Sequence, residues 1–185
     1  MTATQKQVDE LSQHDGVGEA EGQYLTFMLA GEEYGVEILR VQEIKGWESA
    51  TPIPNTPEHV LGVLNLRGAV VPIIDLRKRF NLDSVAYGPT TVVIVVKIKH
   101  ADQERTVGLV VDAVADVYRL DSSEIQTPPD MGGDVETEYV RGLATVEGKM
   151  VILLELDRLL DSSDVLVTGA DIAANAEADK AGEAA

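Results

Sequence analysis

Histidine, aspartate and glutamate are the residue types in this chain that could carry acid–base or metal chemistry. The histidines are His14, His59 and His100, in an acidic N-terminal segment, a proline-rich loop and a predicted surface hairpin. Such scattering provides no catalytic triad and no paired metal-ligand spacing. Acidic pairs such as Glu32-Glu33 are typical of solvated turns. Because the chain also has no cysteine, P-loop, nucleophile elbow or dinucleotide glycine pattern, we expect no enzyme activity and no catalytic, cofactor or metal site.

Arg67 offers a different chemistry, because a guanidinium group can bind a carboxylate of another protein through two parallel hydrogen bonds. It follows the alternating residues Leu64, Asn65 and Leu66 and precedes Gly68. This pattern places Arg67 on the polar face of a strand, just before a tight turn. We predict that it is an exposed recognition residue for a partner protein.

The element that must position Arg67 is the segment 60–80, which reads VLGVLNLRGAVVPIIDLRKRF. Its alternating first part and its apolar second part predict two strands joined by a turn at Arg67-Gly68. Asp75 then predicts the N-cap of a short helix with a basic last turn, and Asn81 predicts its left-handed end.

The same module recurs 80 residues later, at 140–160, as VRGLATVEGKMVILLELDRLL. Aligned pairs include Gly62 with Gly142, Gly68 with Gly148, and Arg67 with Glu147. A weaker match relates residues 35–44 to residues 108–117. The chain is therefore predicted to hold two copies of one β-rich unit. We expect Gly68 and Gly148 to adopt positive φ in equivalent hairpin turns.

Alternating or apolar runs predict further strands at 24–29, 34–38, 41–45, 90–98, 105–111 and 113–118. Alternation within 41–45 puts Val41 on the same face as Glu43. The run 90–98 is apolar at almost every position, so we expect burial on both faces, between two subdomains or inside one barrel. Residues 100–104 are expected to form an exposed loop. About ten short strands with a few short helices predict a mainly β protein of two intertwined small barrels.

Charge separates the 185 residues into a core and two tails. Residues 1–22 and 161–185 carry −4 and −5 of the formal net charge of −17. We expect both tails to be disordered and the folded domain to span residues 23–160. The core has no basic stripe and few aromatic residues, which argues against nucleic-acid binding. No apolar run approaches the roughly 20 residues of a membrane span, and the N-terminus lacks an apolar signal segment, so we expect no membrane insertion.

Four segments carry a resemblance to a known family: GEEYGVEILRVQEI at 31–44, NTPEHVLGVLNLRGAVVPIIDLR at 55–77, TVVIVV at 91–96 and TEYVRGLATVEGKMVILL at 137–154. They resemble the CheW family, the coupling proteins of bacterial chemotaxis. The resemblance implies an adaptor of two SH3-like five-stranded barrels that links the cytoplasmic tips of chemoreceptors to the regulatory domain of the histidine kinase CheA. It also implies a cytoplasmic protein, monomeric alone, that is recruited to membrane-associated chemoreceptor arrays. The alternative is a paralogous coupling protein of another chemosensory-type pathway, such as pilus-based motility.

The resemblance further implies a partner-binding surface at Val41, Glu43, Gly62, Asn65, Arg67 and Gly68. For the glycines the alternative is a backbone requirement, because Gly142 and Gly148 recur in the second copy. For Val41 the alternative is core packing. Arg67 differs from these residues, because its counterpart Glu147 has the opposite charge.

Overall fold

The computed structural model describes residues 22–100, 102–129 and 137–160, so the predicted tails at 1–22 and 161–185, apart from Gly22, lie outside the described residues. The strands are β1 (Gln23–Leu29), β2 (Glu32–Glu37), β3 (Val41–Gly46), β4 (Val60–Leu66), β5 (Ala69–Asp75), β6 (Val92–His100), β7 (Gln103–Val111), β8 (Ala113–Arg119), β9 (Val140–Val146) and β10 (Lys149–Leu154). The helical pieces are short: α2 (Leu76–Arg79), α3 (Leu156–Leu159) and the 3-10 turns η1 (Ile38–Arg40), η2 (Ser122–Glu124) and η3 (Thr137–Tyr139). The predicted mainly β architecture is confirmed.

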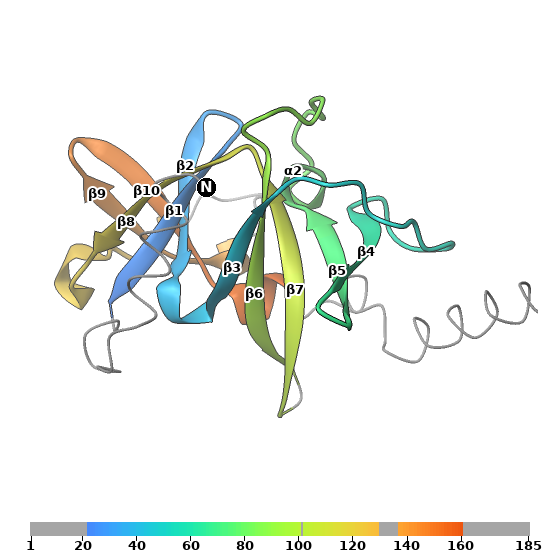
Figure 1. Ribbon diagram of the computed structural model, residues 1–185. Helices are drawn as coiled ribbons and strands as arrows, with labels where there is room; N and C mark the ends of the chain where they lie inside the picture. The colour runs from blue at the N-terminus through green and yellow to red at the C-terminus, as the bar shows by residue number, and fades with distance from the viewer. Residues whose placement is uncertain (1–21, 101, 130–136, 161–185) are drawn as a thin grey trace, which may run out of the picture.

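The strands form two five-stranded sheets that exchange strands between the halves of the chain (Figure 1). Sheet A has the order β8-β1-β2-β10-β9, and sheet B has the order β3-β6-β7-β5-β4. The first half of the chain therefore supplies β1 and β2 to sheet A and β3 to β5 to sheet B, and the second half supplies the remaining strands of each. This exchange confirms two equivalent, intertwined subdomains.

Parallel strand pairs join the two halves within each sheet. Gly35 of β2 lies beside Leu153 of β10, and Gly108 of β7 lies beside Ile73 of β5. A Cβ at Gly35 would stand 2.9 Å from Leu153 Cδ2, and one at Gly108 would stand 2.5 Å from Ile73 Cδ1. Glycine makes room for the large neighbour at both places. The repeat of this arrangement confirms the weaker of the two internal sequence matches.

Three apolar cores hold the sheets in place. The largest takes residues from both sheets and lies between them, with Phe27 of β1 and Leu109 of β7 fully buried. Sheet A curls around a smaller core of its own that includes Val151 and Leu153, and sheet B curls around another that includes Ile73. Each strand therefore buries apolar side chains on one face or both.

β6 confirms the predicted strand that is buried on both faces. Val93 and Val95 pack inside sheet B, whereas Ile94, Val96 and Ile98 pack in the core between the sheets. All five side chains are at most 1% exposed. Their branched shapes suit a strand that packs on two sides.

The predicted exposed loop at residues 100–104 is wrong. β6 continues to His100 and β7 begins at Gln103, and the pairs Lys99–Glu104 and His100–Gln103 extend the hairpin. These strand ends project beyond the core, so they carry polar residues on both faces. Without alternating apolar residues, the sequence of this segment looks like that of a loop.

Single-residue bridges bring the edges of each sheet together. After β3, Thr51 exchanges two backbone hydrogen bonds of 2.9 Å with Val63 of β4. After β8, Gln126 exchanges two of 2.8 Å with Leu143 of β9. In each sheet, the segment that follows one edge strand therefore bridges to the opposite edge strand, so the sheet curls toward a barrel.

The helix after the first hairpin starts and ends as predicted. The Asp75 carboxylate accepts hydrogen bonds from the backbone N–H groups of Arg77, at 2.9 Å, and Lys78, at 3.4 Å. Asn81 has φ of 55° directly after the helix and its C-cap. The cap and the left-handed residue confine α2 to a single turn.

Candidate protein-binding site

The β4–β5 hairpin ends in a two-residue turn in which both residues are left-handed. Arg67 has φ of 53° and Gly68 has φ of 85°, the pattern of a type I′ turn. The Oδ1 atom of Asn65 accepts a 2.9 Å hydrogen bond from the Gly68 N–H. In the equivalent turn Glu147 has φ of 51° and Gly148 of 78°, so the predicted positive φ of both glycines is confirmed. The predicted turn at Arg67-Gly68 is confirmed, whereas the placement of Arg67 on the polar face of the strand is wrong, because β4 ends at Leu66.

Arg67 reaches across the opening of sheet B to Glu43 on β3. Its Nη2 atom lies 2.8 Å from Glu43 Oε2. The Arg67 side chain is 85% exposed, whereas that of Glu43 is 23% exposed. Because β3 and β4 are the two edge strands of sheet B, this ion pair spans the gap between its edges. We call Glu43, Asn65, Arg67 and Gly68 the sheet B rim.

Val41 lies on the opposite face of β3 from Glu43, so the prediction that they share a face is wrong. The register between β3 and β6 shifts here, and Val41 stands opposite Val96 while Glu43 stands opposite Val95. A β-bulge of this kind interrupts the alternation of side chains. Val41 packs half-buried against the core between the sheets. It is therefore a core residue and lies outside the rim.

Gly62 is required by the backbone. It has φ of 138°, and a Cβ there would stand 2.0 Å from the carbonyl oxygen of Thr51. In the second copy a Cβ at Gly142 would stand 2.4 Å from Ile125 Cγ2. Both glycines let the closing bridge of their sheet pass close to the strand, so Gly62 supports the rim from a distance.

Apolar surface lies beside the charged rim. Val70 stands opposite Asn65 in the hairpin and is 46% exposed. An exposed arginine next to apolar surface is typical of protein–protein interfaces.

The described residues show neither a metal site nor a membrane-spanning helix. Within residues 22–100, 102–129 and 137–160, no group of three or more His, Cys, Asp or Glu is arranged to hold a metal ion. His59 precedes β4 and His100 ends β6, while His14 lies outside the described ranges. None of the helices in those ranges has the length and apolar character of a membrane span.

Residues 23–164 match the family model of the CheW-like domain. The chain belongs to the CheW family. It is 45% identical over 149 residues to the chemotaxis protein CheW of Klebsiella aerogenes, a match that spans 80% of this chain and 87% of the relative. It is 41% identical over 140 residues to the chemotaxis protein CheW of Rhizobium meliloti, spanning 76% and 88%. The resemblance carried by the four sequence segments is therefore confirmed.

A solved structure confirms the CheW fold of the chain. The crystal structure of scaffolding protein TtCheW from Thermoanaerobacter tengcongensis is similar with a TM-score of 0.69 and 36% sequence identity. The similarity covers 77% of this chain and 94% of that chain.

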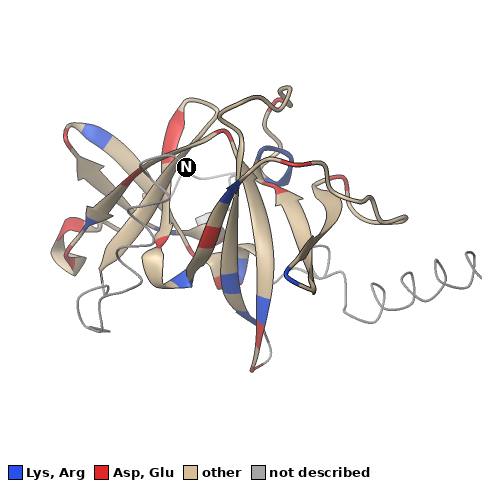
Figure 2. Ribbon diagram, in the orientation of Figure 1, with Lys and Arg blue, Asp and Glu red and all other residues tan. Residues whose placement is uncertain are grey.

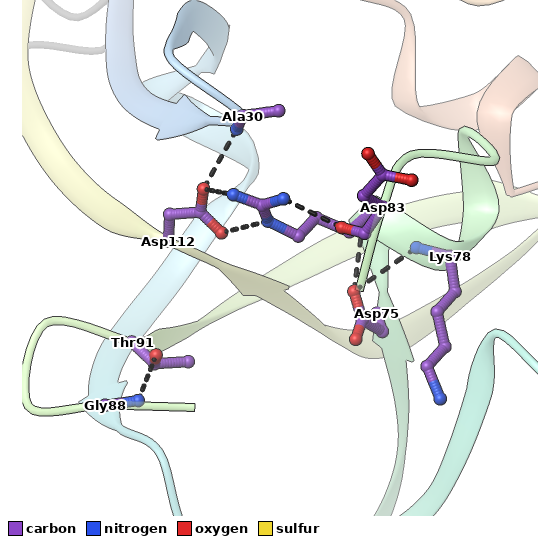
Figure 3. A network of polar contacts seen from close by, with 8 residues as sticks. Ala30, Asp75, Lys78, Asp83, Gly88, Thr91 and Asp112 are labelled. Atoms are coloured by element: carbon purple, nitrogen blue, oxygen red, sulfur yellow. Dashed lines mark hydrogen bonds and ion pairs between the residues drawn. The ribbon is translucent and has the colours of Figure 1, made fainter. Parts of the chain in front are cut away.

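A salt bridge from α2 fastens the two sheets of this CheW domain to each other (Figure 3). Arg77 donates from Nε to Asp112 Oδ1 at 2.7 Å and from Nη2 to Asp112 Oδ2 at 2.6 Å. Asp112, which lies between β7 and β8, also accepts a 2.9 Å hydrogen bond from the N–H of Ala30 in the β1–β2 turn. The hydrogen bonds from Arg77 hold the pKa of Asp112 below its ordinary value.

The second copy of the CheW unit contains the equivalent salt bridge with its charges reversed. Asp157 stands 80 residues after Arg77 and lies 2.8 Å from Arg40 Nη2, which belongs to the β2–β3 connection. Neither salt bridge was predicted, nor was the Arg67–Glu43 pair. The opposite charges at the aligned positions 77 and 157 were the available signal, because each charge calls for an oppositely charged partner.

Proposed function

We propose that this chain is the adaptor that couples chemoreceptors to the histidine kinase CheA, and that its sheet B rim binds one of these partners. Membership of the CheW family supports a coupling role in chemotaxis. The proposed partners are the regulatory domain of CheA and the cytoplasmic tips of chemoreceptors. The protein acts by binding, without catalysis or cofactor. Alone it is a cytoplasmic monomer, and it joins membrane-associated arrays through these partners.

An exposed arginine in a left-handed backbone conformation is the observation that carries the role of the rim. A non-glycine residue at φ of 53° costs about 1 kcal/mol relative to an ordinary conformation. An exposed ion pair such as Arg67–Glu43 contributes only about 0.5 kcal/mol in return. The fold also accepts Glu147 at the equivalent turn position. Folding stability therefore does not explain the arginine, whereas recognition by a partner does.

The geometry of the ion pair suits a partner that presents a carboxylate. The contact with Glu43 uses Nη2, one of the three guanidinium nitrogens, and the Arg67 side chain is 85% exposed. The outward donors can bind a carboxylate bidentately. Glu43 meanwhile restrains the arginine before binding, which reduces the entropy lost when the complex forms.

The other predicted residues support this contact from within the fold: Val41, Gly62, Asn65 and Gly68. Asn65 and Gly68 stabilise the turn that presents Arg67. Val41 packs against the core between the sheets, and Gly62 makes room for the bridge to Thr51. Of the six, we assign direct contact with the partner to Glu43 and Arg67.

The test is Arg67→Ala, measured by thermal unfolding and by calorimetric titration against the CheA regulatory domain and, separately, a receptor signalling fragment. Loss of an interface anchor costs about 2 kcal/mol, so we expect roughly thirtyfold weaker binding to one partner. The melting temperature should stay almost unchanged, because the residue is exposed. Arg119→Ala, at an exposed arginine that ends β8, is the matched control and should leave both affinities intact.

A charge exchange separates recognition from stability. The double variant with Glu43→Arg and Arg67→Glu keeps an ion pair across the rim but reverses its direction. We expect wild-type stability with binding still lost. Unchanged affinity of Arg67→Ala for both partners would refute the role of the rim, and a loss of binding in proportion to a loss of stability would make Arg67 a structural residue.

A further inference from the structure

The end of sheet A that corresponds to the sheet B rim is acidic. Glu147 replaces Arg67 at the hairpin turn, and Asp116 on β8 replaces Glu43 on β3. Glu33 on β2 adds a third carboxylate. Figure 2 shows acidic segments of β2, β8 and the β9–β10 hairpin at the same end of sheet A. The ion pair that spans the edges of sheet B therefore has two like charges as its counterpart in sheet A.

Glu33 is the unusual member of this group. Its side chain is only 9% exposed, and its Oε1 atom has no hydrogen-bond partner among the described atoms. It lies on the inner face of sheet A, because its neighbour Val151 on β10 belongs to the core inside that sheet. A buried carboxylate oxygen without a partner is destabilising, and native proteins satisfy nearly all such atoms. Sheet B has the neutral Thr106 at the corresponding place.

The three carboxylates all act electrostatically on Tyr118 of β8. Burial raises the pKa of the Tyr118 phenol, and the charges of Glu33, Glu147 and Asp116 raise it further. We call these four residues the sheet A mouth. Lys149, on the same hairpin, is exposed and supplies one ammonium group against the three carboxylates. The mouth therefore keeps an excess of negative charge beside a carboxylate that is already desolvated.

We propose that the sheet A mouth binds an arginine side chain of a partner protein, which takes the place that Arg67 occupies in the sheet B rim. The guanidinium group would pair with the exposed carboxylates of Glu147 and Asp116, and the Glu33 side chain would have to turn outward to bring its buried Oε1 atom to the same group. An arginine fits better than a lysine, because its planar group carries several donors and is easily desolvated. The two ends of the molecule then have opposite chemistry: sheet B presents an arginine and sheet A accepts one.

The direct test uses a disulfide-cyclised hairpin peptide with one arginine at its turn, titrated into the isotopically labelled full chain and followed by NMR. We expect amide shifts at Tyr118, Val146 and Val151, which line sheet A on its inner side. The same peptide with citrulline, which has the shape of arginine without its charge, should bind at least tenfold more weakly. Equal binding of the two peptides, or shifts confined to other regions, would overturn the proposal.

Two variants test the mouth from the side of the chain. Glu33→Gln keeps the side-chain shape, should raise the melting temperature by removing a buried charge, and should weaken the arginine peptide at least tenfold. Glu147→Arg supplies an arginine from the chain itself, at a backbone φ of 51° that Arg67 tolerates at 53°. It should raise the melting temperature and abolish peptide binding.

Glu32→Gln is the matched control, because Glu32 is an exposed neighbour of Glu33. It should leave both stability and peptide affinity unchanged. If Glu33→Gln and Glu147→Arg raise the melting temperature while the peptide still binds with wild-type affinity, the mouth is not its site. That result would also leave the role proposed for Arg67 untouched, since the two experiments probe opposite ends of the molecule.

Discussion

Replacing Gly62 by alanine should destabilise the domain far more than replacing the turn glycine Gly68. The new Cβ would stand 2.0 Å from the Thr51 carbonyl oxygen and 2.5 Å from its carbon, both backbone atoms. The residue would also keep φ of 138°, a region closed to most side chains that costs about 1–3 kcal/mol. Moving Thr51 away would sacrifice its two hydrogen bonds to Val63, at about 1 kcal/mol each. We therefore expect a loss of about 4 kcal/mol, a large part of the stability of an ordinary domain.

Urea unfolding followed by far-UV circular dichroism measures this loss, and two other glycines calibrate it. Gly68→Ala should cost about 1 kcal/mol, because its φ is 85° but no atom lies within 4 Å of the added Cβ. Gly46 has neither a positive φ nor an atom within 4 Å of an added Cβ, so the unfolding free energy of Gly46→Ala should stay within about 0.5 kcal/mol of the parent value. If Gly62→Ala were no less stable than Gly68→Ala, the close approach of Thr51 would not constrain the position, and partner contact would become the better explanation of Gly62.

Two further predictions concern acid stability and the tails. The pKa of Asp112 is lowered in the folded state, so its pairing with Arg77 stabilises the domain above the unfolded pKa of about 3.9 and is lost as the pH falls through the folded value. Asp112→Asn should lower the unfolding free energy by about 2 kcal/mol at pH 7. In urea unfolding, the difference between variant and parent should become smaller below about pH 4. A difference that does not depend on pH would contradict a stabilising ion pair between Asp112 and Arg77. Removal of residues 1–21 and 161–185 should leave a cooperatively folding domain that still binds CheA, as circular dichroism and titration would show, and a truncated chain that fails to fold would place part of the domain in these segments.

Local features of this fold could be predicted because one or two residues determine each of them. The cap at Asp75 needs only a carboxylate before a helical turn, and the positive φ of Gly68 needs only a glycine after a strand. The doubly buried strand β6 is visible in its unbroken apolar run. Each of these signals lies within a few residues of the feature it specifies.

The sequence predicted that the two halves intertwine, but it did not identify which strands pair between them or that Arg67 meets Glu43, because these contacts join distant residues. β2 pairs in parallel with β10, and β5 pairs in parallel with β7, although each partner belongs to the other half of the chain. Nothing in the sequence near Glu43 indicates that the edges of sheet B meet there. The bulge before Glu43 is equally hidden, since one extra residue shifts Val41 to the other face without changing the apolar pattern.

The duplication nevertheless shows which positions the fold constrains, because each position of the unit is filled twice. At positions where close backbone approach leaves no room for a side chain, both copies carry the same residue, as Gly62 and Gly142 do beside the bridges of their sheets. Where a contact within the fold decides, a change in one residue is matched by a change in its partner. Asp157 replaces Arg77, and it pairs with the cation Arg40, which lies one position after Leu39, the aligned counterpart of Asp112.

The sheet B rim and the corresponding end of sheet A do not show such matched changes. Glu147 replaces Arg67, yet Asp116 keeps the negative charge of Glu43, so the reversal has no compensating change inside the protein. A charge that the fold does not compensate destabilises the free molecule unless something else neutralises it. The cost is tolerable if a partner supplies the missing opposite charge, and the partner of sheet A must then differ from the partner of sheet B. An adaptor built from two copies of one unit can thereby hold two different proteins at once.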